Sequence, residues 1–329
     1  MSILNMLIKN SVEILFFLCR KIFSAAVALF VIVSLTFFLM KAIPGDPFQD
    51  EKALPKEIHE QLRKHYGLED SFSKQYIRYL SSVVKFDFGP SLKYKGRSVT
   101  SIIREGFPVS FLLGVEAILI AVGMGISVGT FAAMNRNCRL DHGVMILIAI
   151  GISVPNFALA TFLQYFFAVK WQLFPVARFE SFFHTILPAI SLAALPAAFI
   201  ARLMRGQMIE VLRQDYIKTA KSKGLRDSEI IIKHVFRNAL LPVTAYLGQL
   251  TGSILTGSFV VEKIFAIPGS GQWFVRSVMH RDYSVIMGLT VFYALIFMGS
   301  ILFFDLVNFL LDPRLRENSA AKLSFRRSY

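Results

Sequence analysis

Charged residues are scarce in this sequence, at 18% of its 329 residues, whereas soluble domains have about 25%. Only two cysteines occur, so a framework of disulfides is not expected. The sequence has no Gly-Lys dipeptide, which excludes the GxxxxGK[S/T] loop that binds nucleotide phosphates. The six histidines lack the spacing of zinc ligands, and no nucleophile-elbow motif occurs. We therefore predict no catalytic residues, no bound metal and no cofactor.

The sequence instead contains long apolar runs, and 54% of its residues are hydrophobic. A helix needs about 20 mostly apolar residues to cross a bilayer. A soluble helical protein would need polar faces on such segments, and these lack them. The sequence therefore predicts an all-α membrane protein with six transmembrane helices. The predicted spans are residues 22–40, 108–134, 144–169, 186–201, 243–261 and 285–311.

The distribution of Lys and Arg in the loops predicts that both termini are cytoplasmic. The segments that would then lie inside carry 19 basic residues, against 5 in the two short outer loops, 170–184 and 262–284. The long outer loop 41–107 is not counted, because the rule fails above about 60 residues. The net charge of +14 is then explained by loops that face anionic lipid. No basic stretch is interleaved with aromatics, so a nucleic-acid partner is not expected. The inner segments are residues 1–21, 135–143, 202–242 and 312–329.

The outer loop 41–107 is predicted to contain two short helices, at 55–66 and 72–86. The first span has a longer apolar run than a signal peptide, so we expect it to be retained. Glycines spaced by four, at 125/129 and 248/252, predict close helix packing. A pore-lining role is the alternative for them. Prolines 155, 188 and 196 fall inside predicted spans, which favours an interior position where neighbouring helices satisfy the freed backbone groups.

Three acidic residues fall in or beside the spans, where charges are functional candidates by default. Glu116 is a candidate for facing a transport pathway, with a structural hydrogen bond to a neighbouring helix as the alternative. Asp305 is expected to snorkel or to pair with a cation from the inner side. Glu262 is expected at the outer membrane interface.

The inner loop 202–242 is too polar to enter lipid and too long for a tight connection. Apolar positions at spacings of three and four predict a helix over 204–223. Gly224 interrupts it, a second helix follows to Asn238, and Pro242 marks the entry into the fifth span. A basic helix–Gly–helix elbow of this kind suits docking of a partner protein. A helix lying on lipid fits its composition equally well.

Residues 215–225 (DYIKTAKSKGL) with 237–242 (RNALLP) resemble the EAA loop of binding-protein-dependent ABC importer permeases. They are most similar to the dipeptide/oligopeptide branch. Lys218 and Thr219 depart from the first two positions of the general signature, and the gap from Gly224 to Pro242 is longer; both departures resemble the peptide branch. Other matching motifs are IPGDP at 43–47, YGL at 66–68, FDFG at 86–89, SVP at 153–155, VVE at 260–262, IPGSG at 267–271, RDY at 281–283 and DPR at 312–314.

The resemblance implies a type I ABC importer permease in a bacterial inner membrane, with a permease core at 108–311. It implies a second, homologous permease, two ABC ATPases, an extracytoplasmic binding protein and a peptide substrate. The binding protein would dock over loops 41–107 and 262–284. The coupling loop would contact an ATPase through Asp215, Tyr216, Thr219, Ala220, Gly224, Leu225, Asn238 and Pro242. Ile267, Pro268 and Gly269 would form a docking or gate segment, with a plain turn as the alternative. Candidates for the pathway are Glu116, Pro155 and Gly252.

Three alternatives compete with a peptide importer. A nickel-chelate importer permease belongs to the same branch by resemblance. An ion-coupled secondary transporter would require an inverted repeat and several midplane ionisable groups, and the sequence shows neither. A membrane scaffold without transport activity does not explain the glycines and prolines in the spans.

Overall fold

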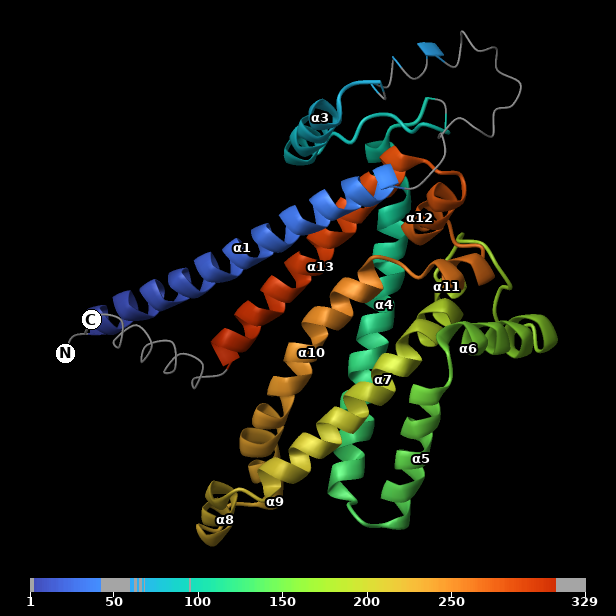
Figure 1. Cartoon of the computed structure of the whole chain (residues 1–329). Coiled ribbons are helices and arrows are strands. Elements are labelled where there is room, and N and C mark those ends of the chain that lie inside the picture. The colour runs from blue at the N-terminus through green and yellow to red at the C-terminus, as the bar shows by residue number, and fades with distance from the viewer. Residues whose placement is uncertain are drawn as a thin grey trace.

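The computed structural model describes residues 3–42, 60–61, 64, 67, 69–94 and 96–311, with side chains from residue 18 onward. Within these residues the regular secondary structure is helical, apart from one isolated bridge between Pro90 and Ser98, and turns and loops such as 171–182 connect the helices. Figure 1 shows long helices that run side by side, with shorter helices gathered at two opposite ends. Most of the helix predicted at 55–66, and the segments 43–47 and 312–329, lie outside the described residues.

The helices follow one another with short connections, labelled as in Figure 1. The first half comprises α1 (Ile3–Ala42), α3 (Phe72–Lys85), α4 (Val99–Met134), α5 (Arg139–Ser153) and α6 (Asn156–Leu163), which continues as the π-helix η1 (Gln164–Lys170). The second half comprises α7 (Phe183–Leu212), α8 (Asp215–Ser222), α9 (Asp227–Ile230) with the π-helix η2 (Ile231–Phe236), α10 (Arg237–Leu255), α11 (Phe259–Ile264), α12 (Ser270–Met279) and α13 (Tyr283–Leu311).

Four described helices, α1, α4, α7 and α13, are long and apolar enough to cross a membrane. A fifth crossing results if α5 and α6/η1 are taken as one bent span. The predicted fifth span, 243–261, corresponds to α10, which begins with Arg237 and ends at Leu255. It is less apolar than the other four because it also includes Asn238 and Gln249. The all-α membrane fold is confirmed, and α10 is its least apolar long helix.

The second span extends further outward than predicted. α4 begins at Val99, nine residues before the predicted start, because Ser98 caps the helix by accepting a hydrogen bond from the Ser101 backbone N–H at 3.1 Å. Pro108 lies inside α4 without ending it. α3, by contrast, closely matches its predicted range of 72–86.

The third span is not the straight helix predicted at 144–169. Its two halves meet at Pro155 and are bent by 102°. Val154 is extended, and Pro155 is the N-cap of α6, as expected for a residue without a backbone N–H and for the residue before it. Few side chains of α5 and α6 are buried within this chain, so the interior position predicted for this span is not observed here. In α7, Pro188 and Pro196 leave the helix continuous, and 61% of its apolar window is buried, as predicted.

The centre of the bundle is the contact between α4 and α7, which depends on small residues. A Cβ at Gly125 would lie 2.6 Å from the Ile200 Cβ, and a Cβ at Gly129 would lie 2.5 Å from the Ala201 carbonyl oxygen. No side chain fits at these separations. The predicted close packing of helices through small residues is therefore confirmed for this pair.

Gly248 and Gly252 of α10 pack in the same way against α13. A Cβ at Gly252 would lie 2.5 Å from Phe297 Cδ2 and 2.7 Å from Ser300 Oγ. These contacts support packing as the role of this glycine.

Replacing Gly252 with valine should lower the thermal unfolding temperature in detergent, because overpacking a well-filled contact costs about 1–3 kcal/mol. Gly123→Val is the matched control, since nothing lies within 4 Å of a Cβ at Gly123 in the apolar helix α4. Equal unfolding temperatures for the two variants would contradict the packing role.

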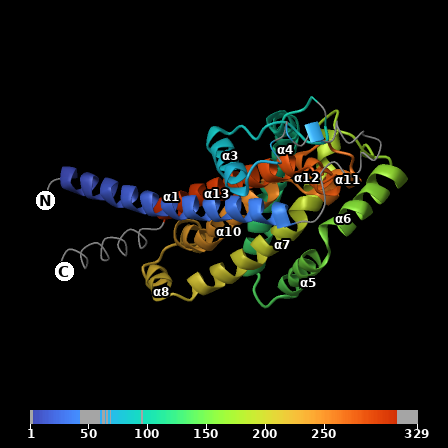
Figure 2. The same cartoon turned by 45° about the horizontal axis from the view of Figure 1, so that its top comes forward.

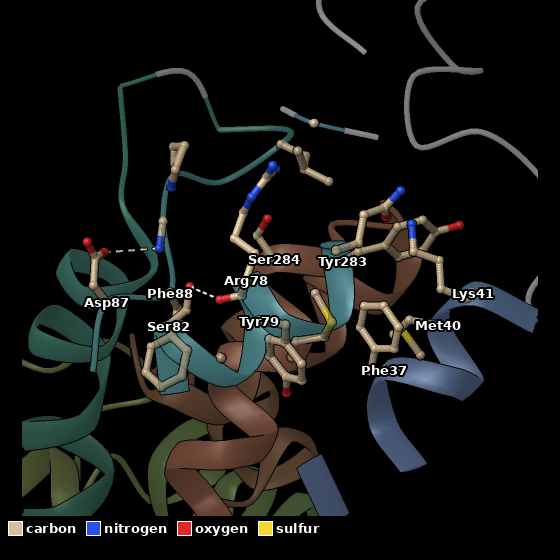
Figure 3. A pocket seen from close by; sticks show the side chains of 17 residues that line it. Phe37, Met40, Lys41, Arg78, Tyr79, Ser82, Asp87, Phe88, Tyr283 and Ser284 are labelled. Carbon is tan, nitrogen blue, oxygen red and sulfur yellow. Dashed lines mark hydrogen bonds between the residues drawn. The ribbon is translucent and has the colours of Figure 1, made fainter. Parts of the chain in front are cut away.

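The outer end of α1 is covered by α3, as both views in Figures 1 and 2 show. Phe37 of α1 stacks on Tyr79 of α3, with ring centroids 5.8 Å apart, and Ser34 hydrogen-bonds to Tyr76 at 2.7 Å. A cavity of about 270 Å³ lies between α1, α3 and the start of α13. Figure 3 shows its lining, including Phe37 and Tyr79. These contacts join part of the outer loop to the bundle.

Candidate functional site

The inner loop forms an elbow at the end of the bundle opposite α3 (Figure 1). The prediction of a single helix over 204–223 is wrong. Its first nine residues complete α7, which ends at Leu212, and α8 begins separately at Asp215. Gln214 between them has extended backbone angles. The membrane helix α7 therefore leads directly to the elbow, which we define as residues 213–238 and call the coupling elbow.

Gly224 makes the turn between α8 and α9. Its φ is +79°, in the left-handed region, and its N–H donates to the Lys221 carbonyl oxygen at 2.9 Å. Nothing lies within 4 Å of the position that a Cβ would occupy. Glycine is therefore favoured here by the backbone conformation, and the space beside it is open.

One side of the coupling elbow is buried in the bundle. Ile217, Ile230 and Val235 have 1% exposure or less and belong to the same core cluster as Met208 of α7. Ala220, also buried, lies on this side. The elbow is therefore held firmly against the inner end of α7, with its other side exposed.

The remaining predicted coupling residues lie on the exposed side or in the connections. Asp215, Thr219 and Asn238 are exposed, and Leu225 is partly buried against the core. Tyr216 accepts a hydrogen bond at its hydroxyl from Asn238 Nδ2 at 2.8 Å, which joins α8 to the start of α10. A hydrogen bond from Lys218 lowers the pKa of the exposed Asp215 carboxyl group. Pro242, predicted to mark the entry to the fifth span, lies inside α10.

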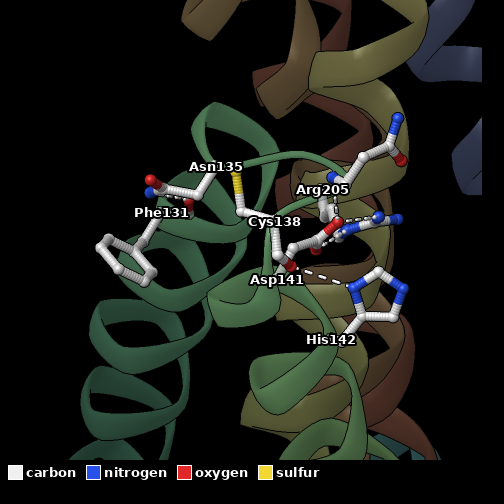
Figure 4. Close-up of polar contacts among 7 residues, drawn as sticks. Phe131, Asn135, Cys138, Asp141, His142 and Arg205 are labelled. Atoms are coloured by element: carbon white, nitrogen blue, oxygen red, sulfur yellow. Dashed lines mark hydrogen bonds and ion pairs between the residues drawn. The ribbon is translucent and has the colours of Figure 1, made fainter.

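A partly buried ion pair connects α5 to α7, with the Asp141 side chain 3% and the Arg205 side chain 22% exposed (Figure 4). Arg205 donates from Nε and Nη2 to the two carboxylate oxygens of Asp141, both at 2.7 Å. Asp141 is 2% exposed and also accepts from the Asn137 backbone N–H. Neither residue was singled out from the sequence, because the partners lie 64 positions apart and no local pattern joins them.

The acidic residues singled out from the sequence have different environments. Asp305 pairs with Lys21 of the N-terminal segment, with 2.7 Å between Oδ2 and Nζ, which confirms the pairing with a cation; that this cation lies on the inner side stays a prediction. Glu116 lies half-buried on α4 and makes no hydrogen bond or ion pair to any described residue. Glu262, expected at the outer interface, is instead completely buried.

At the outer end, the segment predicted to dock the binding protein is largely enclosed. Ile267 is completely buried, and Gly269 is buried beside the Glu262 carboxyl group. Pro268 between them is exposed. Of the three predicted docking residues, Pro268 presents its side chain at the surface.

The described residues form a bundle of apolar helices with a helix–Gly–helix elbow at one end and short helices at the opposite end, the architecture of a multi-pass membrane protein. Residues 125–317 match the family described as the binding-protein-dependent transport system inner membrane component. Residues 14–113 match the N-terminal part described for the membrane components of such systems. The chain belongs to this family, and it is a multi-pass inner-membrane protein.

Relatives with assigned names cover nearly the whole chain. The dipeptide transport system permease protein DppB of Bacillus subtilis is 51% identical over 91% of this chain and 97% of its own length. The oligopeptide transport system permease protein OppB of Haemophilus influenzae is 40% identical over 91% of this chain and 99% of its own. An inward-facing structure of the MetNI methionine ABC transporter is similar in fold, with a TM-score of 0.54 and 16% identity over 64% of this chain and 96% of that chain.

Proposed function

We propose that this chain is the transmembrane permease subunit of an ATP-driven importer for dipeptides or oligopeptides. It would form half of the translocation pathway. The family supports binding-protein-dependent transport, and relatives named for dipeptide and oligopeptide transport support peptides as the cargo. The observation that carries the proposal is the coupling elbow, which is anchored on α7 and has an open turn at Gly224.

The coupling elbow would transmit movement from another chain to the membrane helices of this subunit. A separate ATPase would seat against its exposed side, at Asp215, Tyr216, Thr219, Gly224 and Asn238. Because Ile217 and Ile230 hold the elbow to the core, a displacement of α8 would move α7. When two ATPases close around bound nucleotide, they would then move the membrane helices of two paired permeases. ATP hydrolysis is assigned to the partners because the sequence lacks a phosphate-binding loop.

The complete assembly would contain a second, homologous permease, two ABC ATPases and an extracytoplasmic binding protein. Both chain termini and the coupling elbow would lie in the cytoplasm, as the basic loops indicate. The binding protein would dock over 41–107 and 262–284, with Pro268 as an exposed contact. Glu116 is the strongest candidate for the pathway because it carries a half-buried carboxyl group without a described partner. Pro155 would contribute through the bend that it makes in the third span.

Two other functions fit the observations less well. A nickel-chelate importer would use the same fold, and the relatives named for peptide transport favour peptides over it. An ion-coupled secondary transporter would work without an ATPase, and membership of a binding-protein-dependent family speaks against it.

Co-purification tests the proposal directly. The tagged chain, expressed with its neighbouring subunits, should bring down an ATPase, and vesicles containing the complex should take up peptide only with ATP inside and binding protein outside. Uptake by the purified chain alone, or an elbow that is labelled from outside the cell, would contradict it.

A further inference from the structure

Glu262 lies at the centre of the outer-end helices, in a segment that we call the outer elbow (residues 257–282, with α11 and α12). Its side chain has 0% exposure and is among the largest completely buried side chains of the described chain. Burial raises the pKa of this carboxyl group, and hydrogen bonds from Ser110 and backbone N–H groups oppose the rise. The coupling function proposed above assigns no role to this residue.

The Glu262 carboxyl group connects the outer elbow to α4 through a chain of hydrogen bonds. Ser110 of α4 donates from Oγ to Glu262 Oε1 at 2.7 Å. The Ser270 backbone N–H, at the start of α12, donates to the same Ser110 Oγ at 2.8 Å. The Gln272 backbone N–H donates to Glu262 Oε2 at 3.1 Å. One carboxyl group therefore joins α11, α12 and α4.

The backbone around this carboxyl group is shaped to admit it. Cβ atoms at Gly257, Gly269 and Gly271 would lie 2.6, 2.4 and 3.0 Å from Oε1, Cδ and Oε2 of Glu262, respectively. Gln272 closes the same loop by donating from Nε2 to the Ile267 carbonyl oxygen at 2.7 Å. The space occupied by the carboxyl group is therefore built by two segments of the outer elbow, the turn at Gly257 and the start of α12 at 269–271.

No lysine or arginine pairs with Glu262 among the described residues. An unpaired buried carboxyl group costs free energy that an apolar side chain of similar size would avoid. Packing alone therefore does not account for an acid at this position. A carboxylate, unlike an apolar group, accepts several strong hydrogen bonds at once and so fixes the relative positions of the groups that donate them.

We propose that Glu262 is a positioning residue that holds the outer elbow to α4, so that the two move as one body when a binding protein docks. The inference rests on the proposed function. The displacement would reach the inner side through direct contacts, because Gly125 and Gly129 of α4 pack against α7 and α7 leads to the coupling elbow. Without the Glu262 carboxylate, α11 would lose its hydrogen-bonded connection to α4, and α12 would keep only the Ser270–Ser110 hydrogen bond and its direct packing there.

Glu262→Gln is the primary test, because glutamine keeps the size and removes the charge. In either orientation of the amide, Nε2 replaces an oxygen that accepts a hydrogen bond in the wild type, from Ser110 Oγ or from the Gln272 N–H, so the carboxylate's connections cannot all be kept. In the complete complex in vesicles, we expect stimulation of ATP hydrolysis by the liganded binding protein, measured relative to each variant's own unstimulated rate, to be reduced about fivefold or more. Glu180→Gln, an exposed acid on the outer loop, is the control and should be stimulated normally.

A disulfide that replaces the Glu262 connection distinguishes a positioning role for this residue from a contribution to the overall stability of the chain. Ser110 Oγ and Ser270 Oγ are 3.2 Å apart, so cysteines at both positions would bring two sulfur atoms close together, and a small shift would reach the disulfide bond length of about 2.0 Å. In a Glu262→Gln chain that also carries Cys19→Ser, Cys138→Ser, Ser110→Cys and Ser270→Cys, oxidation with diamide should restore stimulation and dithiothreitol should remove it again. Mass spectrometry of peptides verifies the bond.

Normal stimulation of Glu262→Gln would overturn the inference, and so would a verified disulfide that leaves the complex unstimulated. The second result would mean that α4 and α12 separate during transport. A wild-type complex that the binding protein does not stimulate would overturn this inference alone, whereas a wild-type complex that takes up no peptide with ATP would contradict the proposed function as well.

Discussion

Replacing Gly224 with valine should reduce peptide uptake about tenfold or more, with the chain still assembled in the membrane. Two effects combine. A β-branched residue at a φ of +79° costs about 1–2 kcal/mol, which distorts the turn between α8 and α9. The new side chain would also project into the open space beside the turn, where we propose that the ATPase sits.

The measurement is ATP-driven uptake in vesicles beside ATP hydrolysis by the same complex. Hydrolysis should continue while uptake fails, because the ATPases remain intact and the coupling surface does not. Gly143→Val is the matched control, since it places the same side chain in open space on α5. Gly224→Asn should be milder, because asparagine tolerates the left-handed region. Wild-type uptake by Gly224→Val would contradict a coupling role for this turn.

Arg205→Gln should destabilise the chain by about 1–3 kcal/mol, the cost of leaving a buried hydrogen-bonding group without its partner. Asp141 is 2% exposed and loses both of its Arg205 hydrogen bonds. The separation of α5 from α7 should appear as a lower unfolding temperature in detergent. Asp141→Asn should have a similar effect, because it leaves the Arg205 charge without its carboxylate.

The double variant Asp141→Asn with Arg205→Gln provides the internal check. It removes both charges, so it should be destabilised by clearly less than the sum of the two single variants. Arg202→Gln, an exposed arginine one turn earlier on α7, should unfold at the wild-type temperature. Additive losses in the double variant would show that the two side chains do not depend on each other.

Local patterns in the sequence determined most of the helices of this protein. Apolar runs predicted spans that correspond to α1, α4, α7 and α13, because a helix that faces lipid satisfies its own backbone and needs only apolar side chains. The amphipathic pattern of 72–86 likewise matched α3. The glycine at 224 marked the turn of the coupling elbow, because a left-handed residue has few alternatives to glycine.

The tertiary structure alone decided how these helices meet. Pro155 marked an interruption, but the 102° bend depends on the packing of both halves. The partners Asp141 and Arg205 are 64 residues apart, and Ser110 and Glu262 are 152 residues apart. Periodicity along one helix is a short-range property that sequence reports directly. The pairing of buried polar groups depends on which helices become neighbours, and that is settled by the packing of the whole bundle.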